Sequence, residues 1–362
     1  MKRTRNLMLA TVMGATLALS ACGGSDSDGN GGGSGGGSDK VGKVGIILPD
    51  TVSSVRWETA DRPALEKAFK DAGVTAYIQN ARGDADQMAK IAQSLISKKI
   101  SVLAIVNLDN KSGAAIEKKA AAAGVKTIDY DRLTLGGNAD FYVSYDNTKV
   151  GELQGAGLQK CLGDKKANIA FLNGSPDDSN ATLFSKGAHN VLDKDSNYTK
   201  VAEQAVQKWD PTTATTVFQQ MFTKEGGKID GVLAANDGLA GSAISVLQKN
   251  NVAGKVPVTG QDATVEGLQR ILAGTQCMTV YKSAKAEAGA VAKLAIALAK
   301  GEKGSAEQTS RDDEGNRDVP SVLLDPVSVD KSNVKDVIAD GGAAKEDVCK
   351  GFAKECADAG IS

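Results

Sequence analysis

The chain of 362 residues is poor in aromatic rings and in histidine: Phe, Trp and Tyr make up 4% of it, with two tryptophans, and there is one histidine. The chain also has no large excess of charge of one sign, since it contains 43 Lys and Arg residues and 44 Asp and Glu residues. No basic run interleaved with aromatic residues occurs, so nucleic acid is not an expected partner. With 41% apolar residues, a chain of this length is able to build two domain-sized cores.

Catalytic motifs are missing as well. Apart from GGSGG at 32–36 in a Gly/Ser-rich segment, the sequence contains no G-x-S-x-G, and it contains no P-loop and no H-E-x-x-H. His189 falls in the middle of a predicted helix, where a structural or solvated role is expected. The segment DKDSN at 193–197 starts like a calcium loop, but Tyr198 and Gln204 replace the glycine and glutamate that such a loop needs. A glycosidase with paired carboxylates is an alternative. It is disfavoured because the acidic residues are spread over several positions that are predicted to bind a ligand. We therefore expect no enzyme, no metal ion and no cofactor.

The N-terminus has the pattern of a secretory signal. MKRTR is followed by an apolar stretch at residues 7–19, too short to span a membrane, and then by LSAC. LSAC matches the lipobox of bacterial lipoproteins, in which Cys22 becomes the lipidated first residue once residues 1–21 are removed; an ordinary cleaved signal is the alternative. Residues 22–40 are rich in Gly and Ser and are expected to be a flexible tether. We expect an extracytoplasmic lipoprotein, held at the outer face of the cell membrane through its lipid anchor only.

Four further cysteines, Cys161, Cys277, Cys349 and Cys356, are disulfide candidates, because exported proteins mature where thiols oxidise. Four thiols allow three pairings, and the sequence leaves the pairing open. On one continuous helix Cys349 and Cys356 would lie about 10 Å apart, beyond bonding reach. Either the chain bends between them or each pairs elsewhere. No Cys-x-x-Cys occurs, so a zinc or a redox site is not expected.

From residue 41 onward, short β-branched runs alternate with amphipathic helical stretches, which indicates an α/β fold with parallel sheets covered on both faces. The first series has expected strands at 43–48, 74–80, 101–107 and 125–131, a helix at 57–72, and a second helix whose inner face carries Met88, Ile91, Ala92 and Leu95. After 141–147 the pattern restarts, with expected strands at 167–173, 201–207, 229–236 and 256–262 and helices near 179–193, 213–224 and 239–249. Two such units predict two similar lobes.

The segment after Cys277 breaks this tandem order. It contains an expected strand at 278–283, an Ala-rich helix at 284–300, a charged loop at 301–318 and a β-branched run at 321–329. These late elements are able to complete either lobe, which leaves open whether the lobes exchange strands through several crossings.

Polar side chains recur where the expected strands end. In an open parallel sheet, ligands bind beyond the carboxyl ends of the strands. The residues at these ends are Asp131, Arg132, Asn173, Asn236, Asp237, Gln261 and Asp262, and the loop at 177–181 adds carboxylates and an amide. Each of them alone is explained by helix capping, to which Asp and Asn are suited. Together, on two lobes, they predict one shared cleft.

Such a cleft suits a neutral polyhydroxyl ligand. Each sugar hydroxyl donates and accepts a hydrogen bond; carboxylates accept, amides do both, and Arg or Lys donate charge-assisted bonds. An indole is able to cover the apolar C–H face of a sugar ring. Both tryptophans, Trp57 and Trp209, lie in polar loops, where half-exposed packing is the alternative to a ligand contact.

Several motifs between about residues 43 and 345 carry a resemblance to a known family. In chain order they are RW at 56–57, YDR at 130–132, DFYVSYDN at 140–147 with VGEL at 150–153, NGSP at 173–176, ND at 236–237, GQDA at 260–263, AGTQ at 273–276 with MTVYK at 278–282, and DVPS at 318–321. With these motifs the chain resembles the solute-binding proteins of bacterial sugar ABC transporters. Among them it most resembles the D-xylose-binding branch of the ribose/galactose-binding-like family.

The resemblance implies two Rossmann-like lobes joined by a three-stranded hinge, the type I fold of periplasmic binding proteins. Lobe 1 would comprise 41–145 plus about 283–325, and lobe 2 would comprise 146–282 plus about 326–362. It also implies a monomer that captures a monosaccharide by hinge closure and delivers it, chemically unchanged, to an ABC transporter permease. D-xylose is the leading candidate for this monosaccharide. A sugar-sensing subunit for a membrane signalling receptor, or a binding protein for glucose, arabinose or galactose, is the alternative.

Ligand contacts are implied by the resemblance as well. They are Arg56, Asp131, Asp178, Asn180, Asn236, Asp262 and Lys282, with Trp57 and Trp209 over the sugar ring and Arg132 beside this set. Within TIDYDRL at 127–133, Asp129 is expected to be structural or to support the site, whereas Asp131 at the strand end is expected to accept a sugar hydroxyl. Arg132 would either donate to the ligand or hold that carboxylate in place. The loop at 51–54 and Ser179 depart from the family pattern, which leaves the fine sugar selectivity open.

Overall fold

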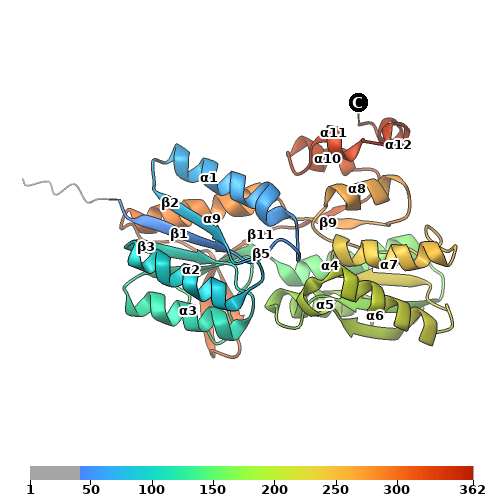
Figure 1. The fold of residues 1–362 in the computed structure, drawn as a ribbon. Helices are drawn as coiled ribbons and strands as arrows, with labels where there is room; N and C mark the ends of the chain where they lie inside the picture. The colour runs from blue at the N-terminus through green and yellow to red at the C-terminus, as the bar shows by residue number, and fades with distance from the viewer. Residues whose placement is uncertain (1–40, 362) are drawn as a thin grey trace, which may run out of the picture. The chain divides into compact units, whose positions relative to one another are not determined.

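The computed structural model describes residues 41–361, so the predicted signal peptide at 1–21, the lipidation site Cys22 and the tether at 22–40 lie outside the described residues. Within residues 41–361, strands and helices alternate along the chain. They build two lobes, each around its own parallel sheet (Figure 1).

The sheet of lobe 1 has seven strands in the order β10-β11-β5-β4-β3-β1-β2. They are β1 (Lys43–Leu48), β2 (Ala76–Asn80), β3 (Ile100–Ile105), β4 (Lys126–Tyr130), β5 (Phe141–Tyr145), β10 (Gln308–Asp312) and β11 (Arg317–Leu324). All neighbouring strands are parallel except β10 and β11.

Helices cover both faces of this sheet. One face carries α1 (Arg62–Asp71) and α9 (Ala284–Ala299), and the other carries α2 (Ala85–Ser97) and α3 (Asn110–Ala122) (Figure 1). Alternation along β1 explains both cores, since Ile46 packs with the first pair of helices and Ile47 with the second. The predicted inner face of α2 is buried, as expected.

Lobe 2 is built on a parallel sheet in the order β7-β6-β8, from β6 (Ala167–Asn173), β7 (Tyr198–Ala205) and β8 (Gly231–Ala234). One face is covered by α4 (Asn147–Leu162) and α5 (Ser179–Leu192), and the other by α6 (Pro211–Lys224) and α7 (Asp237–Lys249). The remaining elements are η2 (Gln207–Trp209), α8 (Val265–Leu272), an antiparallel pair of β9 (Thr279–Tyr281) and β12 (Val327–Val329), and the C-terminal helices α10 (Val334–Ala339), α11 (Lys345–Val348) and α12 (Ala353–Asp358).

The chain passes between the lobes three times. It leaves lobe 1 between β5 and α4, returns between β9 and α9, and leaves again between β11 and β12. Strand β11 therefore pairs with β5 in parallel, although nearly all of lobe 2 lies between them in the sequence. The α/β architecture with two lobes and three crossings confirms the predicted fold class.

Two expected elements differ in the structure. Residues 256–262 were expected to form a strand, but only isolated bridges occur there, at Val256 and Val258. Pro257 lies between them and has no N–H to donate, which limits strand pairing. The loop expected at 301–318 contains β10 and the start of β11; every residue of β10 is polar, so this edge strand shows no apolar alternation.

The helix expected at 57–72 is also divided. It starts as a π-helical turn, η1 (Trp57–Asp61), and continues as α1, with Pro63 in the first turn of α1. Both Trp57 and Asp61 are buried. The irregular turn thus delivers an indole and a carboxylate to the interior at the edge of lobe 1.

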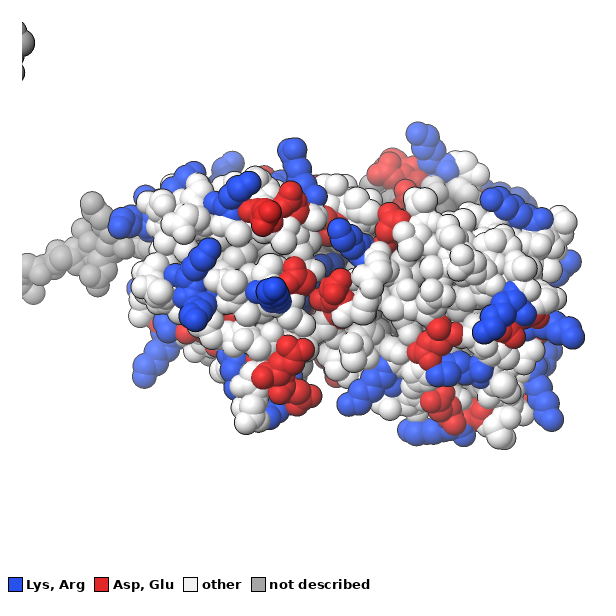
Figure 2. Space-filling model, turned by 60° about the horizontal axis from the view of Figure 1, so that its bottom comes forward, with Lys and Arg blue, Asp and Glu red and all other residues white. Residues whose placement is uncertain are grey.

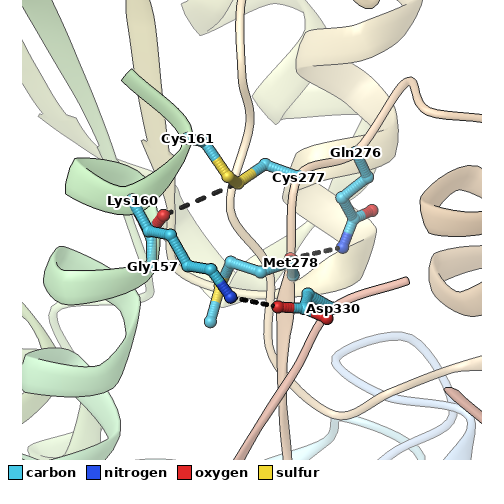
Figure 3. Close-up of a disulfide and its surroundings, with 7 residues drawn as sticks. All are labelled: Gly157, Lys160, Cys161, Gln276, Cys277, Met278 and Asp330. Carbon is cyan, nitrogen blue, oxygen red and sulfur yellow. Dashed lines mark hydrogen bonds and ion pairs between the residues drawn. A yellow bond between two sulfur atoms is a disulfide. The ribbon is translucent and has the colours of Figure 1, made fainter. Parts of the chain in front are cut away.

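The cysteines of the described chain form two disulfides. Cys161 at the end of α4 bonds to Cys277 just before β9, with 6.4 Å between their Cα atoms (Figure 3). The ion pair between Lys160 and Asp330, at 2.7 Å, lies beside this disulfide and joins α4 to the segment that follows β12. Two adjacent links thus fasten α4 to the late elements of lobe 2.

The second disulfide joins Cys349 to Cys356, whose Cα atoms are 5.8 Å apart. Of the two possibilities that the sequence left open, the structure has the first: the chain bends between α11 and α12. Gly351 lies at the bend with a φ of 81°, a left-handed conformation that glycine adopts without a Cβ penalty.

Charges of both signs are interspersed over the face of the protein drawn in Figure 2. This face therefore carries no extended field of one sign. In the described part of the chain, no helix has both the length and the apolar character that crossing a membrane requires.

The disulfide between Cys161 and Cys277 is expected to stabilise the protein more than the disulfide between Cys349 and Cys356. In the chain-entropy model the contribution grows with the loop that a bond closes, and the two sequence separations are 116 and 7. Replacing Cys161 and Cys277 by Ser should lower the free energy of unfolding by about 4–5 kcal/mol, against about 2–3 kcal/mol for the double Ser variant of Cys349 and Cys356. Urea denaturation measures both losses, and equal losses would contradict this ranking.

Candidate functional site

One cavity, lined by residues from both lobes, contains all ten predicted ligand-binding residues. They are Arg56, Trp57, Asp131, Arg132, Asp178, Asn180, Trp209, Asn236, Asp262 and Lys282, and Ser53, Ser54, Phe184 and Gln261 complete the lining. The cavity lies beyond the carboxyl ends of β1, β4 and β8, where ligands bind in open parallel sheets. The structure thus brings the predicted set together; that these residues contact a ligand stays a prediction.

Asp131 follows the last residue of β4 and is held by its own backbone. Its φ of 62° is left-handed, which is uncommon for a residue with a Cβ. Its N–H donates to the carbonyl of Val143 at 2.8 Å. Its carbonyl accepts three hydrogen bonds, from Tyr142 (3.0 Å), Ser144 (2.7 Å) and Asn180 (2.8 Å). These bonds offset the strained conformation and fix the direction of the carboxylate.

Arg56 is the centre of a buried ion-pair cluster at one end of the cavity. Its Nε and Nη2 donate to the two carboxylate oxygens of Asp61 at 2.9 and 2.8 Å. Nη2 also donates to Glu287 at 2.5 Å, and Nη1 donates to Asp131 at 3.3 Å. The Tyr130 hydroxyl donates to Asp61 as well. The planar guanidinium is thereby oriented by charge-assisted bonds on three sides.

The carboxylate of Asp131 stays ionised in this setting. Burial acts to raise the pKa of Asp131, but the neighbouring cations Lys282 and Arg56 outweigh this effect and lower the pKa. The Lys282 ammonium lies between two carboxylates, 3.7 Å from Asp131 and 3.8 Å from Asp262. These distances exceed a direct hydrogen bond, so the three groups keep bonding capacity for a ligand.

Arg132 forms an ion pair across the cleft. Its Nε lies 3.0 Å from Asp178, which belongs to lobe 2, while Nη1 donates to the carbonyl of Asn107 at 3.1 Å. Burial raises the pKa of Asp178 more than the nearby Arg132 lowers it. Two roles were expected for Arg132, donation to the ligand or support of Asp131. The geometry adds a third role, which is pairing with Asp178.

The two tryptophans are buried and close the cavity from opposite lobes. Trp57 is 3% exposed and donates to the Ser53 hydroxyl at 3.1 Å; Trp209 is 5% exposed and donates to Asp178 at 3.1 Å. Half-exposed packing, the alternative to a ligand contact, is therefore wrong for both. Gly174 makes room for the second indole, because a Cβ there would lie 2.1 Å from the Trp209 ring.

Asn236 and Asp262 complete the side of lobe 2. Asn236 caps α7 by accepting from the N–H of Leu239 at 2.9 Å, and its amide donates to the carbonyl of Ser53 in lobe 1 at 3.3 Å. Asp262 has a φ of 92° and lies 3.4 Å from the Ser54 hydroxyl. Helix capping and cavity lining are thus combined in Asn236, and the capping explanation alone is incomplete.

Some polar residues near strand ends lie elsewhere. Asn173 donates to Glu203 at 2.8 Å, outside the cavity. Asp237 turns inward and accepts from Gln276 at 2.7 Å and Thr279 at 2.9 Å; burial raises its pKa to about 6. These residues support the scaffold of lobe 2.

Two side chains singled out in the sequence have structural roles. Asp129 is fully buried and accepts from the N–H and hydroxyl of Thr134 at 2.7 and 2.8 Å, and burial together with Glu117 raises its pKa. His189 stacks on Phe171 with ring centroids 4.4 Å apart, and its two ring nitrogens contact carboxylates. Neither residue lines the cavity.

Sequence reasoning did not assign Ser53, Ser54 or Phe184 to the cavity. The two serines follow β1, so the rule that ligands bind beyond carboxyl ends was a usable signal for them. Phe184 is one helical turn after Asn180 on α5, and nothing in its sequence context distinguishes it from a core residue.

Comparisons with known proteins agree with this geometry. A model of the periplasmic binding protein domain matches residues 44–303. The D-xylose-binding periplasmic protein of Escherichia coli (strain K12) is 36% identical over 307 residues, which are 84% of this chain and 91% of that protein. The multiple sugar-binding periplasmic receptor ChvE of Rhizobium radiobacter is 34% identical over 329 residues, 85% of this chain and 92% of that protein. A carbohydrate transporter solute-binding protein from Chloroflexus aurantiacus in complex with D-glucose has a TM-score of 0.77 at 28% identity, covering 84% of this chain and 97% of that one.

The chain belongs to the periplasmic binding protein family, which confirms the resemblance seen in the sequence. Proteins of this family are transport components that bind a solute and carry out no reaction on it. The protein is therefore not an enzyme.

Asp61→Asn is expected to destabilise the protein, because it removes the carboxylate that holds Arg56 with two hydrogen bonds. Breaking a buried ion pair costs about 3–5 kcal/mol, and the free energy of unfolding in urea should fall by that amount. The matched control is Asp71→Asn, which removes the exposed pair with Lys67 and should cost less than about 1 kcal/mol. Similar small losses in the two variants would show that Asp61 does not hold the guanidinium.

Proposed function

We propose that the protein is an extracytoplasmic solute-binding protein that captures a monosaccharide and delivers it to an ABC transporter permease, with D-xylose as the leading candidate. The observation that carries the proposal is the cavity between the lobes, with its three carboxylates, three cations, amides and two indoles. The similarity to D-xylose-binding periplasmic proteins supports the choice of sugar.

The charge balance of the cavity favours a neutral ligand. The lining has three carboxylates, Asp131, Asp178 and Asp262, and an equal number of Arg and Lys side chains, and each of these cations already lies next to at least one carboxylate. An ionic ligand would leave one of these charges without a partner in a buried site, which is costly. Sugar hydroxyls both donate and accept, so a sugar is able to satisfy carboxylates and cations together.

Capture would proceed by hinge closure. Residues 41–145 with 283–325 and residues 146–282 with 326–362 would move as two bodies about the three crossings. Contacts between the two sides, such as Asn180 with Asp131 and Asn236 with Ser53, belong to the closed arrangement. A sugar that touches both lobes has more contacts in this arrangement and shifts the population toward it.

A broader sugar receptor is the second candidate. One relative is named a multiple sugar-binding periplasmic receptor, and one structural neighbour was solved with D-glucose. Under this proposal the protein would bind several aldoses, glucose, arabinose and galactose among them, or would serve as the sensing subunit of a membrane signalling receptor.

Thermal-shift and calorimetry measurements with a panel of pentoses and hexoses on residues 39–362 test the proposal. D-xylose should raise the melting temperature and ribose at equal concentration should not, because a misplaced hydroxyl leaves buried groups unpaired. Binding should also change the tryptophan fluorescence, since Trp57 and Trp209, the only indoles, both line the cavity. Stabilisation by many aldoses alike would favour the broader receptor, and no shift with any monosaccharide would refute sugar binding.

Asp262→Ala is the control in the same panel. It removes one cavity carboxylate, so the xylose-induced shift should disappear while the variant without sugar stays folded. Wild-type affinity in this variant would place the sugar elsewhere in the protein.

Membrane attachment through Cys22 is a further part of the proposal. The LSAC motif supports lipidation of this residue, with the segment 23–40 as the spacer. In fractionated cells the wild-type protein should sediment with membranes, and the Cys22→Ser variant should not, because its anchor would be missing. A soluble wild-type protein would favour the ordinary cleaved signal.

A further inference from the structure

Glu287 is a buried acid next to the cavity that does not line it. It lies in the first turn of α9, directly after the crossing from lobe 2, and its side chain is 0% exposed. Its Oε2 accepts from Arg56 at 2.5 Å. Its Oε1 is buried with no hydrogen-bond donor in contact, so this oxygen has unused capacity.

The surroundings of Glu287 carry more acids than bases. Asp61, Asp131 and Glu287 all pair with Arg56, and the one further cation of the cluster, Lys282, lies between Asp131 and Asp262. The titratable and charged groups that face Glu287 are Arg56, Asp61, Tyr130, Asp131, Tyr142, Tyr145 and Lys282. With every acid ionised, the acids of this buried cluster would outnumber its cations, and burial disfavours such an excess of negative charge. One retained proton reduces the excess.

The proton belongs on Glu287. Burial and the nearby Asp131 raise the pKa of Glu287 to about 8, against the opposing effect of Arg56. For Asp131 the effect of burial is outweighed by the cations Lys282 and Arg56, which lower its pKa. Both carboxyl groups contact the same guanidinium, Glu287 through Nη2 and Asp131 through Nη1, so they are neighbours. One of the two neighbouring carboxyl groups is thus ionised and the other is neutral, because two carboxylates at close range repel each other.

We propose that Glu287 is a positioning residue of the sugar site: its protonated carboxyl donates a hydrogen bond to the Asp131 carboxylate and holds it where it accepts a ligand hydroxyl. Loss of the proton removes this donor and places a like charge beside Asp131, so ligand affinity falls at alkaline pH. The inference rests on the proposed function, because it takes Asp131 as a sugar contact.

Titration calorimetry with D-xylose tests this role. The dissociation constant of the wild type should rise about tenfold between about pH 6.5 and about pH 9.5. Glu287→Gln has an amide donor at every pH, so it should bind within about threefold of the wild type at the lower pH and lose the pH dependence. Glu287→Leu has a similar volume but no donor and should bind weakly at both values. Glu117→Gln, a buried glutamate of lobe 1 outside the cavity, is the matched control and should keep the wild-type profile.

The melting temperature without sugar gives an independent measurement. Glu287 has a pKa of about 8 in the folded protein and of about 4.3 when unfolded, so the folded state holds the extra proton between these values. Stability that depends on the neutral acid is complete below about pH 4 and is lost as the pH rises through about 8. The melting temperature of the wild type should therefore fall more over this range than that of Glu287→Gln.

The outcomes separate the two proposals. A D-xylose affinity of the wild type that is equal at both pH values, or melting temperatures that fall in parallel, would overturn the role of Glu287 and leave the proposed function intact. Failure of the wild type to bind any monosaccharide would overturn the proposed function, and with it this role.

Discussion

A charge buried in a protein has to be compensated, and the cavity between the lobes is built under this constraint. Taking the Arg56 guanidinium out of water is unfavourable unless negative charge compensates it; Asp61 and Asp131 pair with it, and the Glu287 carboxyl accepts a further hydrogen bond from it. Each of these acids is in turn fixed by the same guanidinium. The mutual compensation produces a rigid polar wall, and rigidity is what allows a site to distinguish one arrangement of hydroxyls from another.

The same constraint connects the lobes. Arg132 of lobe 1 and Asp178 of lobe 2 are both buried, and each is the other's compensating charge. If the lobes separate as proposed, water would take over the compensation for both. Closure would then exchange solvation for ion pairing, a nearly balanced exchange in which a few ligand contacts decide the preferred state.

Much of this arrangement could be predicted from the sequence. The alternation of strands and helices indicated the fold class, and the positions of Asp131, Asn236 and Asp262 at expected strand ends of two lobes predicted one shared cleft. The split of the helix at Asp61, the all-polar edge strand β10 and the choice of disulfide partners could not be predicted, because each depends on neighbours that are distant in sequence. Ser53 and Ser54 were accessible to the strand-end rule but have no chemical feature that marks a serine as part of a site.

The three crossings have a consequence for the order in which the chain acquires structure. The sheet of lobe 2 uses residues 167–234 and has its strands close together in sequence. In lobe 1, β5 pairs with β11, and one face of the sheet is covered by α9. Both elements follow the lobe 2 residues 146–282 in the chain, so they are synthesised only after that segment. During synthesis from the N-terminus, the sheet of lobe 2 is therefore complete before the sheet of lobe 1, and the face of lobe 1 that α9 covers stays exposed in the meantime; β12 and α10–α12 are added to lobe 2 last.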